Sequence, residues 1–79
     1  MTPAQCRAAR GLLELNQTEL AKMCRLNIAT VVDFERRRRE VSLVTVAKMQ
    51  RCLEKAGVEF INGDRPGVRC KERKRRSVP

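Results

Sequence analysis

The stretch QTELAKMCRLNIATVVDFER, residues 17–36, decides the fold, because its apolar residues are spaced for two short helices. Leu20, Cys24, Val31 and Phe34 fall three, four or seven positions apart, so they share one face of each helix. That face is expected to pack inward. The opposite face of the second helix is polar, is flanked by basic residues, and is left free for a ligand.

Capping residues set the expected ends of these two helices. Asn16 caps the first one, and Glu19 completes a capping box with it. Asn27 caps the second helix, predicted at residues 28–36, which leaves residues 25–26 for the turn. Two short helices joined by a sharp turn form the arrangement that delivers a helix into the major groove of DNA.

Two more helices flank this pair. One is predicted at residues 3–14 from the hydroxyl cap Thr2, which is followed by a proline and by a glutamine in the capping-box position. Another is predicted at residues 43–56, with Ser42 as its cap and Gly57 as its stop signal. Their buried stripes are expected to contain Cys6, Ala9, Leu13, Val46, Met49 and Leu53.

After the last helix the pattern changes. Residues 58–61 alternate apolar and polar side chains, and Asn62-Gly63 then gives a strong turn signal. Residues 68–71 alternate too, which predicts a strand or a hairpin that must pack on something, because an isolated two-stranded ribbon is barely stable. The expected organisation is a helical domain at 1–57, a strand or hairpin at 58–71 and a disordered basic tail at 72–79.

Size and charge narrow the functional classes. The chain has 18 Lys and Arg against 9 Asp and Glu, a net charge of +9, which favours a polyanionic partner such as DNA, RNA or anionic lipid. Its 79 residues leave no room for a deep catalytic cleft, so an enzyme is not expected. No apolar run is long enough to cross a bilayer and no leader opens the chain, so we expect an unexported, cytoplasmic protein.

The four cysteines, at positions 6, 24, 52 and 70, lack the paired spacing of a zinc site, and the chain has no histidine. We therefore expect no metal and no cofactor. Three of them lie on apolar helix faces, where a thiol behaves as a small hydrophobe, so no structural disulfide is expected. Cys70 lies outside the helical core, and a bridge between chains there is left open.

The order of helix, NQTELAKMCRLNIATVVDFER, basic loop and a helix ending in AGVEF resembles the Cro/cI-type, xenobiotic-response-element family of helix-turn-helix repressors over about residues 2–60. The resemblance implies a mainly α, four-helix phage-repressor-like bundle, with a recognition helix and symmetric dimers on palindromic operators near promoters. It also implies a bacterial, nucleoid-associated regulator. The C-terminal hairpin is more weakly similar to short regulators of mobile elements. The family usually has glycine where Arg25 and Arg37 stand, and a left-handed backbone at Arg25 costs about 1 kcal/mol.

Groove-facing positions are predicted at Asn27, Ile28, Ala29, Thr30 and Asp33. Asparagine can read adenine, aliphatic side chains can contact thymine methyls, and aspartate can accept from the cytosine amino group. The alternative is that Ile28 and Val32 are merely exposed aliphatics and that Asn27 only caps its helix.

Backbone phosphates are expected to be contacted by side chains around this helix pair. Arg10 is also predicted to pair with Glu35. The phosphate role of Gln17 is carried over from the family, and at least two of the loop arginines can equally be read as a solvated charge run. The predicted phosphate contacts are Gln17, Thr18, Arg10, Arg36, Arg37, Arg38 and Arg39.

One recognition helix covers too few base pairs for useful selectivity, so a homodimer is expected, with a strand edge pairing across a two-fold axis. Predicted interface residues are Val58, Phe60, Ile61 and Val68. The favoured function is a sequence-specific transcriptional regulator that controls its own synthesis and needs no small-molecule ligand. Its alternatives are an antitoxin or restriction controller with a protein partner, and a non-specific nucleoid or RNA-binding protein.

Overall fold

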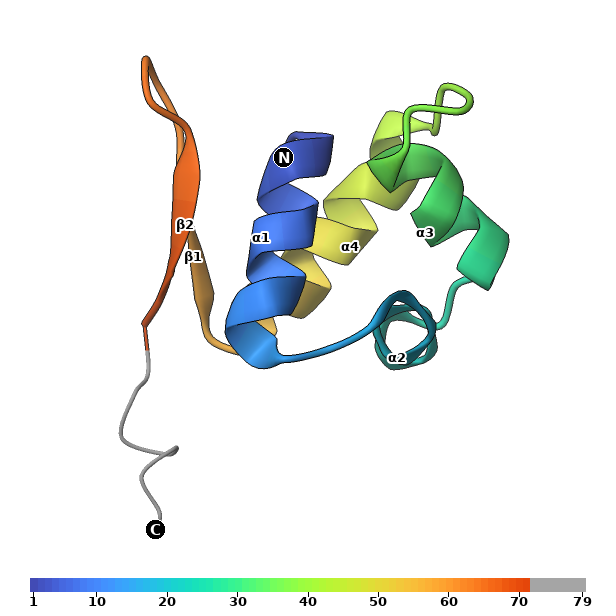
Figure 1. Cartoon of the computed structure of the whole chain (residues 1–79), viewed down its shortest axis with the longest axis horizontal. Coiled ribbons are helices and arrows are strands. Elements are labelled where there is room, and N and C mark those ends of the chain that lie inside the picture. The colour runs from blue at the N-terminus through green and yellow to red at the C-terminus, as the bar shows by residue number, and fades with distance from the viewer. Residues whose placement is uncertain (72–79) are drawn as a thin grey trace, which may run out of the picture.

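The computed structural model describes residues 1–71, and the basic tail predicted at 72–79 lies outside them. The described residues form four helices followed by a two-stranded antiparallel hairpin, so the expectation of a mainly helical fold with a C-terminal hairpin is confirmed (Figure 1). The elements are α1 Pro3–Leu13, α2 Gln17–Cys24, α3 Ile28–Glu35, α4 Leu43–Lys55, β1 Val58–Ile61 and β2 Gly67–Cys70.

The helices begin where their capping residues predict. Thr2 Oγ1 accepts from the Gln5 amide at 3.1 Å, and Gln5 Oε1 accepts from the Thr2 amide at 2.9 Å. The same reciprocal pair joins Asn16 and Glu19 at the start of α2, at 2.7 and 2.9 Å. The predicted C-terminal ends of α1, α3 and α4 each lie one residue too far along the chain.

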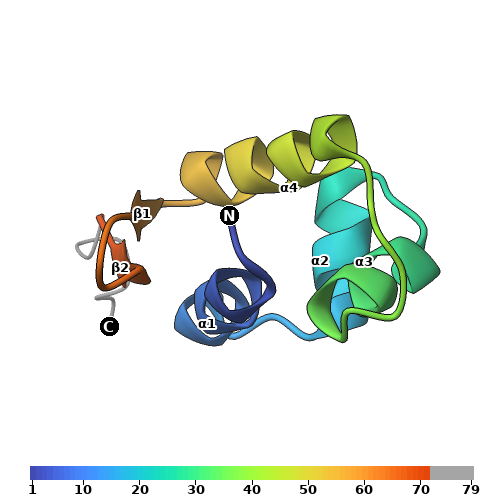
Figure 2. The same cartoon turned by 90° about the horizontal axis from the view of Figure 1, so that it is seen from above.

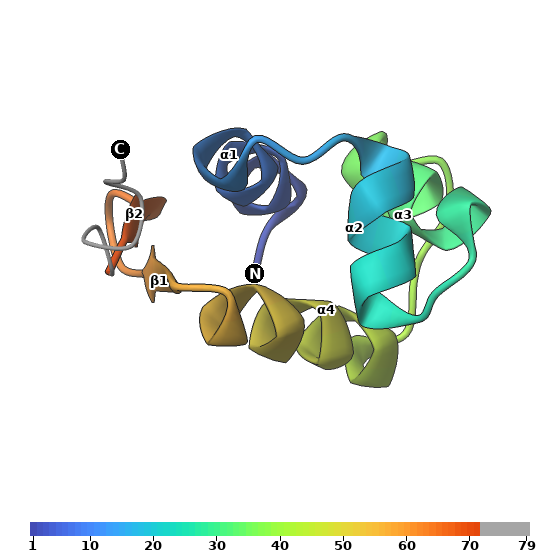
Figure 3. The same cartoon turned by 90° about the horizontal axis from the view of Figure 1, so that it is seen from below.

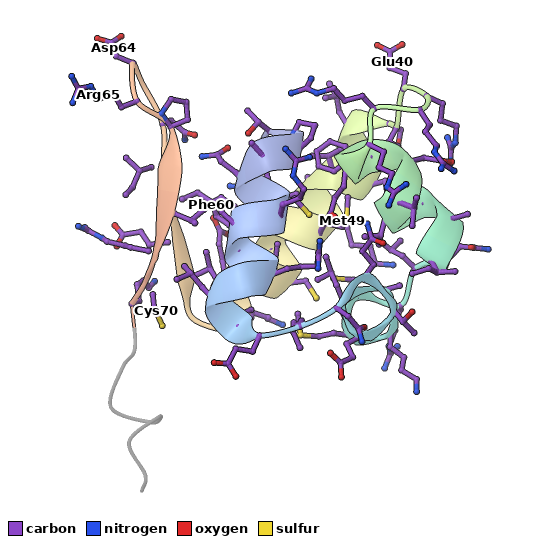
Figure 4. The ribbon with its side chains drawn as sticks, in the orientation of Figure 1. Glu40, Met49, Phe60, Asp64, Arg65 and Cys70 are labelled. Carbon is purple, nitrogen blue, oxygen red and sulfur yellow. The ribbon has the colours of Figure 1, made fainter. Side chains whose placement is uncertain are left out.

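One apolar core joins all four helices and the hairpin. Its fully buried members come from each helix and from the first strand: Cys6, Ala9, Leu20, Val31, Met49, Leu53 and Val58. Met49 points into this interior and Phe60 lies between the hairpin and α1 (Figure 4). The hairpin therefore packs on its own chain, as a two-stranded ribbon requires.

Gln5 ties the hairpin to α1. Its side chain is buried, and Nε2 donates to the carbonyl oxygens of Ile61 at 3.0 Å and Gly67 at 3.1 Å, one on each strand. In the strand register Ile61 pairs with Gly67, and Glu59 pairs with Arg69, whose side chains form an ion pair at 2.8 Å. One glutamine thus satisfies two carbonyl groups at the turn end of the ribbon.

The hairpin and the α2–α3 pair lie at opposite ends of the molecule. Seen from above and from below, α1 and α4 lie between them (Figures 2 and 3). The two ends lie along the longest axis of the molecule, over which it extends 39 Å. Any surface that α3 presents is therefore remote from any surface that the hairpin presents.

Arg25 and Arg37 both adopt the left-handed conformation that glycine favours, with φ of 58° and 54°. Arg25 ends α2, and the amide of the next residue, Leu26, returns to the Ala21 carbonyl at 2.8 Å. Arg37 follows α3, and the Arg38 amide returns to the Asp33 carbonyl at 2.9 Å. Glu14 ends α1 in the same conformation, with φ of 58°. The chain thus keeps the geometry of a glycine-terminated helix with three non-glycine residues and bears the steric cost three times.

Replacing Arg25 by glycine is expected to raise the free energy of unfolding by about 0.5–1 kcal/mol, because relief of left-handed strain exceeds the added entropy of the unfolded chain. Urea denaturation measures the change. The matched control is Arg36→Gly, where φ is −97° and there is no strain to relieve, so that variant should lose stability. A gain in the control, or none at position 25, would contradict this account.

Candidate nucleic-acid interface

Helix α3 packs against α2 across a three-residue connection, residues 25–27 (Figure 1). Val31 is fully buried between them, and Ala21 of α2 is 4% exposed, so a small side chain permits a close approach of the two helices. The two short helices are thereby fixed relative to each other by apolar contact as well as by the turn.

The outward face of α3 and its capping residue Asn27 carry the five residues predicted to contact bases. Asn27, Ile28 and Ala29 are exposed, and Thr30 and Asp33 are half-buried. Ile28 is 40% exposed, so a large aliphatic side chain lies on the outer surface of α3. The structure thus brings all five to one helix, outside the core.

Two of these five residues have partners within the chain. Asn27 Oδ1 accepts from the Ala29 amide at 2.9 Å, so Asn27 is a helix cap whatever else it contacts. Asp33 Oδ2 accepts from Arg39 Nε at 2.8 Å. The Asp33–Arg39 pair joins a predicted base contact to a predicted phosphate contact. Sequence reasoning missed it because Arg39 reaches Asp33 only after the chain reverses at Arg37.

Glu35, at the inner end of α3, is the centre of a buried polar network. Its side chain is 1% exposed and accepts from Arg10 Nε at 2.8 Å and Nη2 at 2.9 Å. Gln17 Nε2 donates to it at 3.0 Å, and the Cys6 thiol donates at 3.1 Å. Arg7 Nη1 donates to the Glu35 carbonyl at 2.6 Å. A single carboxylate therefore links α1, α2 and α3.

The charge of Glu35 is maintained by this network. Burial alone would raise the pKa of the carboxyl group, but hydrogen bonds from Arg10, Gln17 and Cys6 outweigh burial and lower the pKa below its usual value. In return, burial and the adjacent carboxylate raise the pKa of the Cys6 thiol, which stays protonated and donates. The network is a paired, fully satisfied set of charges, as buried ions require.

Stability should therefore fall on acidification. A carboxyl group with a lowered folded-state pKa contributes stability that is present above its unfolded pKa of about 4.5, and this contribution is lost as pH falls through the folded value. Thermal unfolding of the native chain between pH 7 and pH 3 is expected to show this loss. The variant Glu35→Gln, which has no carboxyl group at this position, should lose less stability over the same pH range. Equal losses in the two proteins would contradict the role given to Glu35.

Two predicted phosphate contacts, Arg10 and Gln17, have side chains that take part in this network. The Arg10 guanidinium pairs with Glu35, as expected, and its Nη1 donates to the Leu15 carbonyl at 3.1 Å, so it is not held out for a phosphate. The Gln17 side chain likewise turns inward to Glu35, because its position on the first turn of α2 faces α3. The Gln17 backbone amide, and exposed Thr18 beside it, remain at the start of α2.

The loop after α3 supplies the exposed positive charge. Arg36, Arg37, Arg38 and Arg39 are all exposed, and they adjoin the outward face of α3. Glu40 stands at the tip of this loop (Figure 4). Among the four arginines, the one with a side-chain ion pair in the described part of the chain is Arg39.

The predicted dimerisation residues are divided by the structure. Val58 is fully buried in the core of its own chain, which corrects its assignment to a subunit interface. Phe60 and Val68 pack against the same core and are half-buried, whereas Ile61 is 37% exposed. The alternating pattern was read correctly as a strand, and the inward face of that strand meets α1 and α4 of its own chain.

No protein-family model matches the chain, and no curated protein matches it. Within residues 1–71 the structure contains no helix both long and apolar enough to cross a bilayer. Those residues also hold no cluster of three or more Cys, Asp or Glu side chains suited to a metal ion.

Proposed function

We propose that this chain is a sequence-specific double-stranded DNA-binding transcriptional regulator, in which α2 and α3 form a helix-turn-helix and α3 enters the major groove. The observation that carries the proposal is the division of α3 into two faces. Val31 and Glu35 anchor it from within, while Asn27 to Thr30 face outward beside four exposed arginines. A short, rigidly held helix with an exposed outer face suits the width of the major groove.

The outer face of α3 suggests a partly apolar code. Ile28 and Ala29 can contact thymine methyl groups, and Thr30 can donate to or accept from either base of a pair. Asn27 keeps its amide NH₂ for a base while its oxygen caps the helix. Asp33 can accept from the cytosine amino group through Oδ1, because its ion pair with Arg39 uses Oδ2.

Affinity without sequence information is proposed to come from the loop arginines and from the start of α2. Arg36, Arg37 and Arg38 are exposed cations next to α3, and each neutralised phosphate releases counterions. The first-turn amides of Gln17 and Thr18 offer donors to a phosphate at a positive helix end. Arg10 is left out of this set, because it is committed to Glu35.

Substitutions at Arg38 and Arg39 are expected to differ. Arg38→Ala should weaken binding to all duplexes alike and make the salt dependence shallower by about 0.9 in log–log slope, since one phosphate contact is lost. Arg39→Ala should also change base preference, because it releases Asp33. Fluorescence anisotropy at several salt concentrations, on two unrelated duplexes, measures both. Identical behaviour of the two variants would contradict a role for the Asp33–Arg39 pair.

We propose further that two copies bind a palindrome, with the recognition helices on one face of the duplex and a multiple of ~34 Å apart, because α3 lies at the end of the molecule opposite the hairpin. The open edges of the hairpin and Ile61 are the parts of the predicted interface that remain available. Ile61→Lys should then lower dimer affinity without unfolding the chain. If sedimentation of the Ile61→Lys variant showed an unchanged dimer, the interface would have to lie on another surface.

Selection of bound fragments from random duplex DNA, at stated salt, tests the function itself. An enriched palindrome is the expected result. Uniform recovery of all sequences would favour a nucleoid-type protein, and preference for single-stranded RNA would overturn the proposal. Enrichment of a half-site alone would support base recognition by α3 and would contradict the proposal of a symmetric dimer. An antitoxin or restriction controller would show the same palindrome, and a protein partner would have to be sought separately.

A further inference from the structure

Two cysteines meet in a basic pocket away from the proposed DNA-reading face of α3. Cys24 is the last residue of α2, and Cys52 lies on α4. Both line a pocket of about 280 Å³ whose wall carries four cationic side chains, Arg25, Lys48, Arg51 and Lys55. No acidic side chain lines it. Two thiols from different helices thus share one cavity with a strongly positive rim.

The two thiols differ in access. Cys24 is 3% exposed, whereas Cys52 is half-buried and its Sγ donates to the Met23 carbonyl at 3.5 Å. They also interact directly: burial and the adjacent Cys52 thiol raise the pKa of Cys24 to about 12, and Lys48 opposes that shift. Cys52 is therefore the sulfur that a reagent entering the pocket meets first.

We propose that Cys24 and Cys52 form a reversible redox site, which takes an anionic low-molecular-weight disulfide such as glutathione disulfide and is oxidised to an internal disulfide. The four cations attract the carboxylates of the reagent, and the two thiols supply the electrons. This inference does not depend on DNA binding. It concerns an inducible bond, because Cys24 and Cys52 are not bridged to each other in the structure.

The exchange has two balanced steps. The Cys52 thiolate attacks one sulfur of the reagent; a Cys52–glutathione bond forms, the reagent's S–S bond breaks, and one glutathione thiolate leaves with the proton that Cys52 gave up. The Cys24 thiolate then attacks Cys52 Sγ, and the second glutathione leaves. Two protein thiols are oxidised and one disulfide is reduced to two thiols.

The first step removes one of the effects that disfavour the Cys24 thiolate. Burial is the largest cause that raises the pKa of Cys24 and it persists, but the coulombic repulsion from Cys52 ends once Cys52 is in a neutral mixed disulfide. Lys48 then continues to favour the Cys24 thiolate. Because Cys24 is almost inaccessible to solvent, its accessible target is the neighbouring sulfur.

Oxidation by glutathione disulfide, followed by thiol titration and peptide mass mapping, tests the site in full-length Cys70→Ser, which removes the cysteine outside the helical core. Loss of two thiols and a Cys24–Cys52 linked peptide are expected, with Cys6 still reduced. In the same background Cys24→Ala should accumulate one glutathione on Cys52. The proposal would be overturned if Cys70→Ser with Cys24 present kept a glutathione on Cys52 and formed no internal disulfide, or if Cys52 did not react at all.

Charge variants test the choice of reagent. Arg51→Glu should slow oxidation by glutathione disulfide several-fold and leave the rate with neutral 2-hydroxyethyl disulfide unchanged, because only the anionic reagent is attracted. The matched control is Lys22→Glu, the same kind of charge reversal at an exposed position of α2 outside the pocket lining. Equal slowing by both variants would show that the net charge, not the pocket, attracts the reagent.

Discussion

Replacing Glu35 by alanine is expected to lower the free energy of unfolding by about 3–5 kcal/mol, a large part of the stability of a domain this small. The carboxylate is 1% exposed and pairs with Arg10, whose side chain is 19% exposed. Without it, the guanidinium is left partly buried with no counter-charge, and Gln17 and Cys6 lose their acceptor. Urea denaturation followed by circular dichroism measures the change.

Glu40→Ala is the matched control for this substitution. Glu40 lies in the exposed loop five positions along the chain, and its removal should change stability by no more than about 0.5 kcal/mol. Equal losses at positions 35 and 40 would mean that the buried network contributes nothing beyond ordinary surface charge. Arg10→Ala should lower the free energy of unfolding less than Glu35→Ala does, because the unpaired Glu35 can take up a proton. The stability of the Arg10→Ala variant should then increase on mild acidification.

Ala29→Glu is expected to weaken operator binding by about 100-fold or more while leaving the fold intact. Ala29 is exposed in the first turn of α3, where a carboxylate suits the positive helix end. In the proposed complex the same carboxylate is driven against bases and phosphates, and like-charge contacts of this kind cost several kcal/mol. Anisotropy at fixed salt gives the affinity, and thermal unfolding gives the stability.

Ala8→Glu controls for total charge. Ala8 is also an exposed alanine on a helix, but it lines a pocket beside Pro66 and Gly67, at the hairpin end of the molecule. The two variants have the same net charge, so long-range attraction to DNA changes equally in both. If Ala8→Glu weakened binding as much as Ala29→Glu, α3 would not be the reading helix and binding would follow charge alone.

The helix boundaries could be predicted from sequence because they depend on neighbours. Thr2 and Gln5, like Asn16 and Glu19, exchange hydrogen bonds within one turn, and such pairs are visible as residue spacing. The apolar periodicity of residues 17–36 likewise placed Leu20 and Val31 in the core, where both are fully buried. Local interactions of this range leave a signature in the chain itself.

The contacts that were missed depend on how the elements come together. Gln17 is directed inward by the packing of α2 on α3, and Asp33 meets Arg39 only because the chain turns back after Glu35. Alternation in residues 58–61 predicted a strand, yet it did not indicate whether the apolar face meets its own helices or another subunit. Tertiary geometry decides such choices, and no residue spacing encodes it.

The split between the two faces of α3 makes the residues it presents interchangeable. Val31 and Glu35 hold the helix, whereas Ile28, Ala29 and Thr30 contribute little to the core. A library randomised at these three outward positions should keep one melting temperature over most of its members. Single substitutions at these positions can then change the DNA sequence that is recognised and leave the folded population unchanged. The stability of the fold therefore does not limit which sequences α3 can come to recognise.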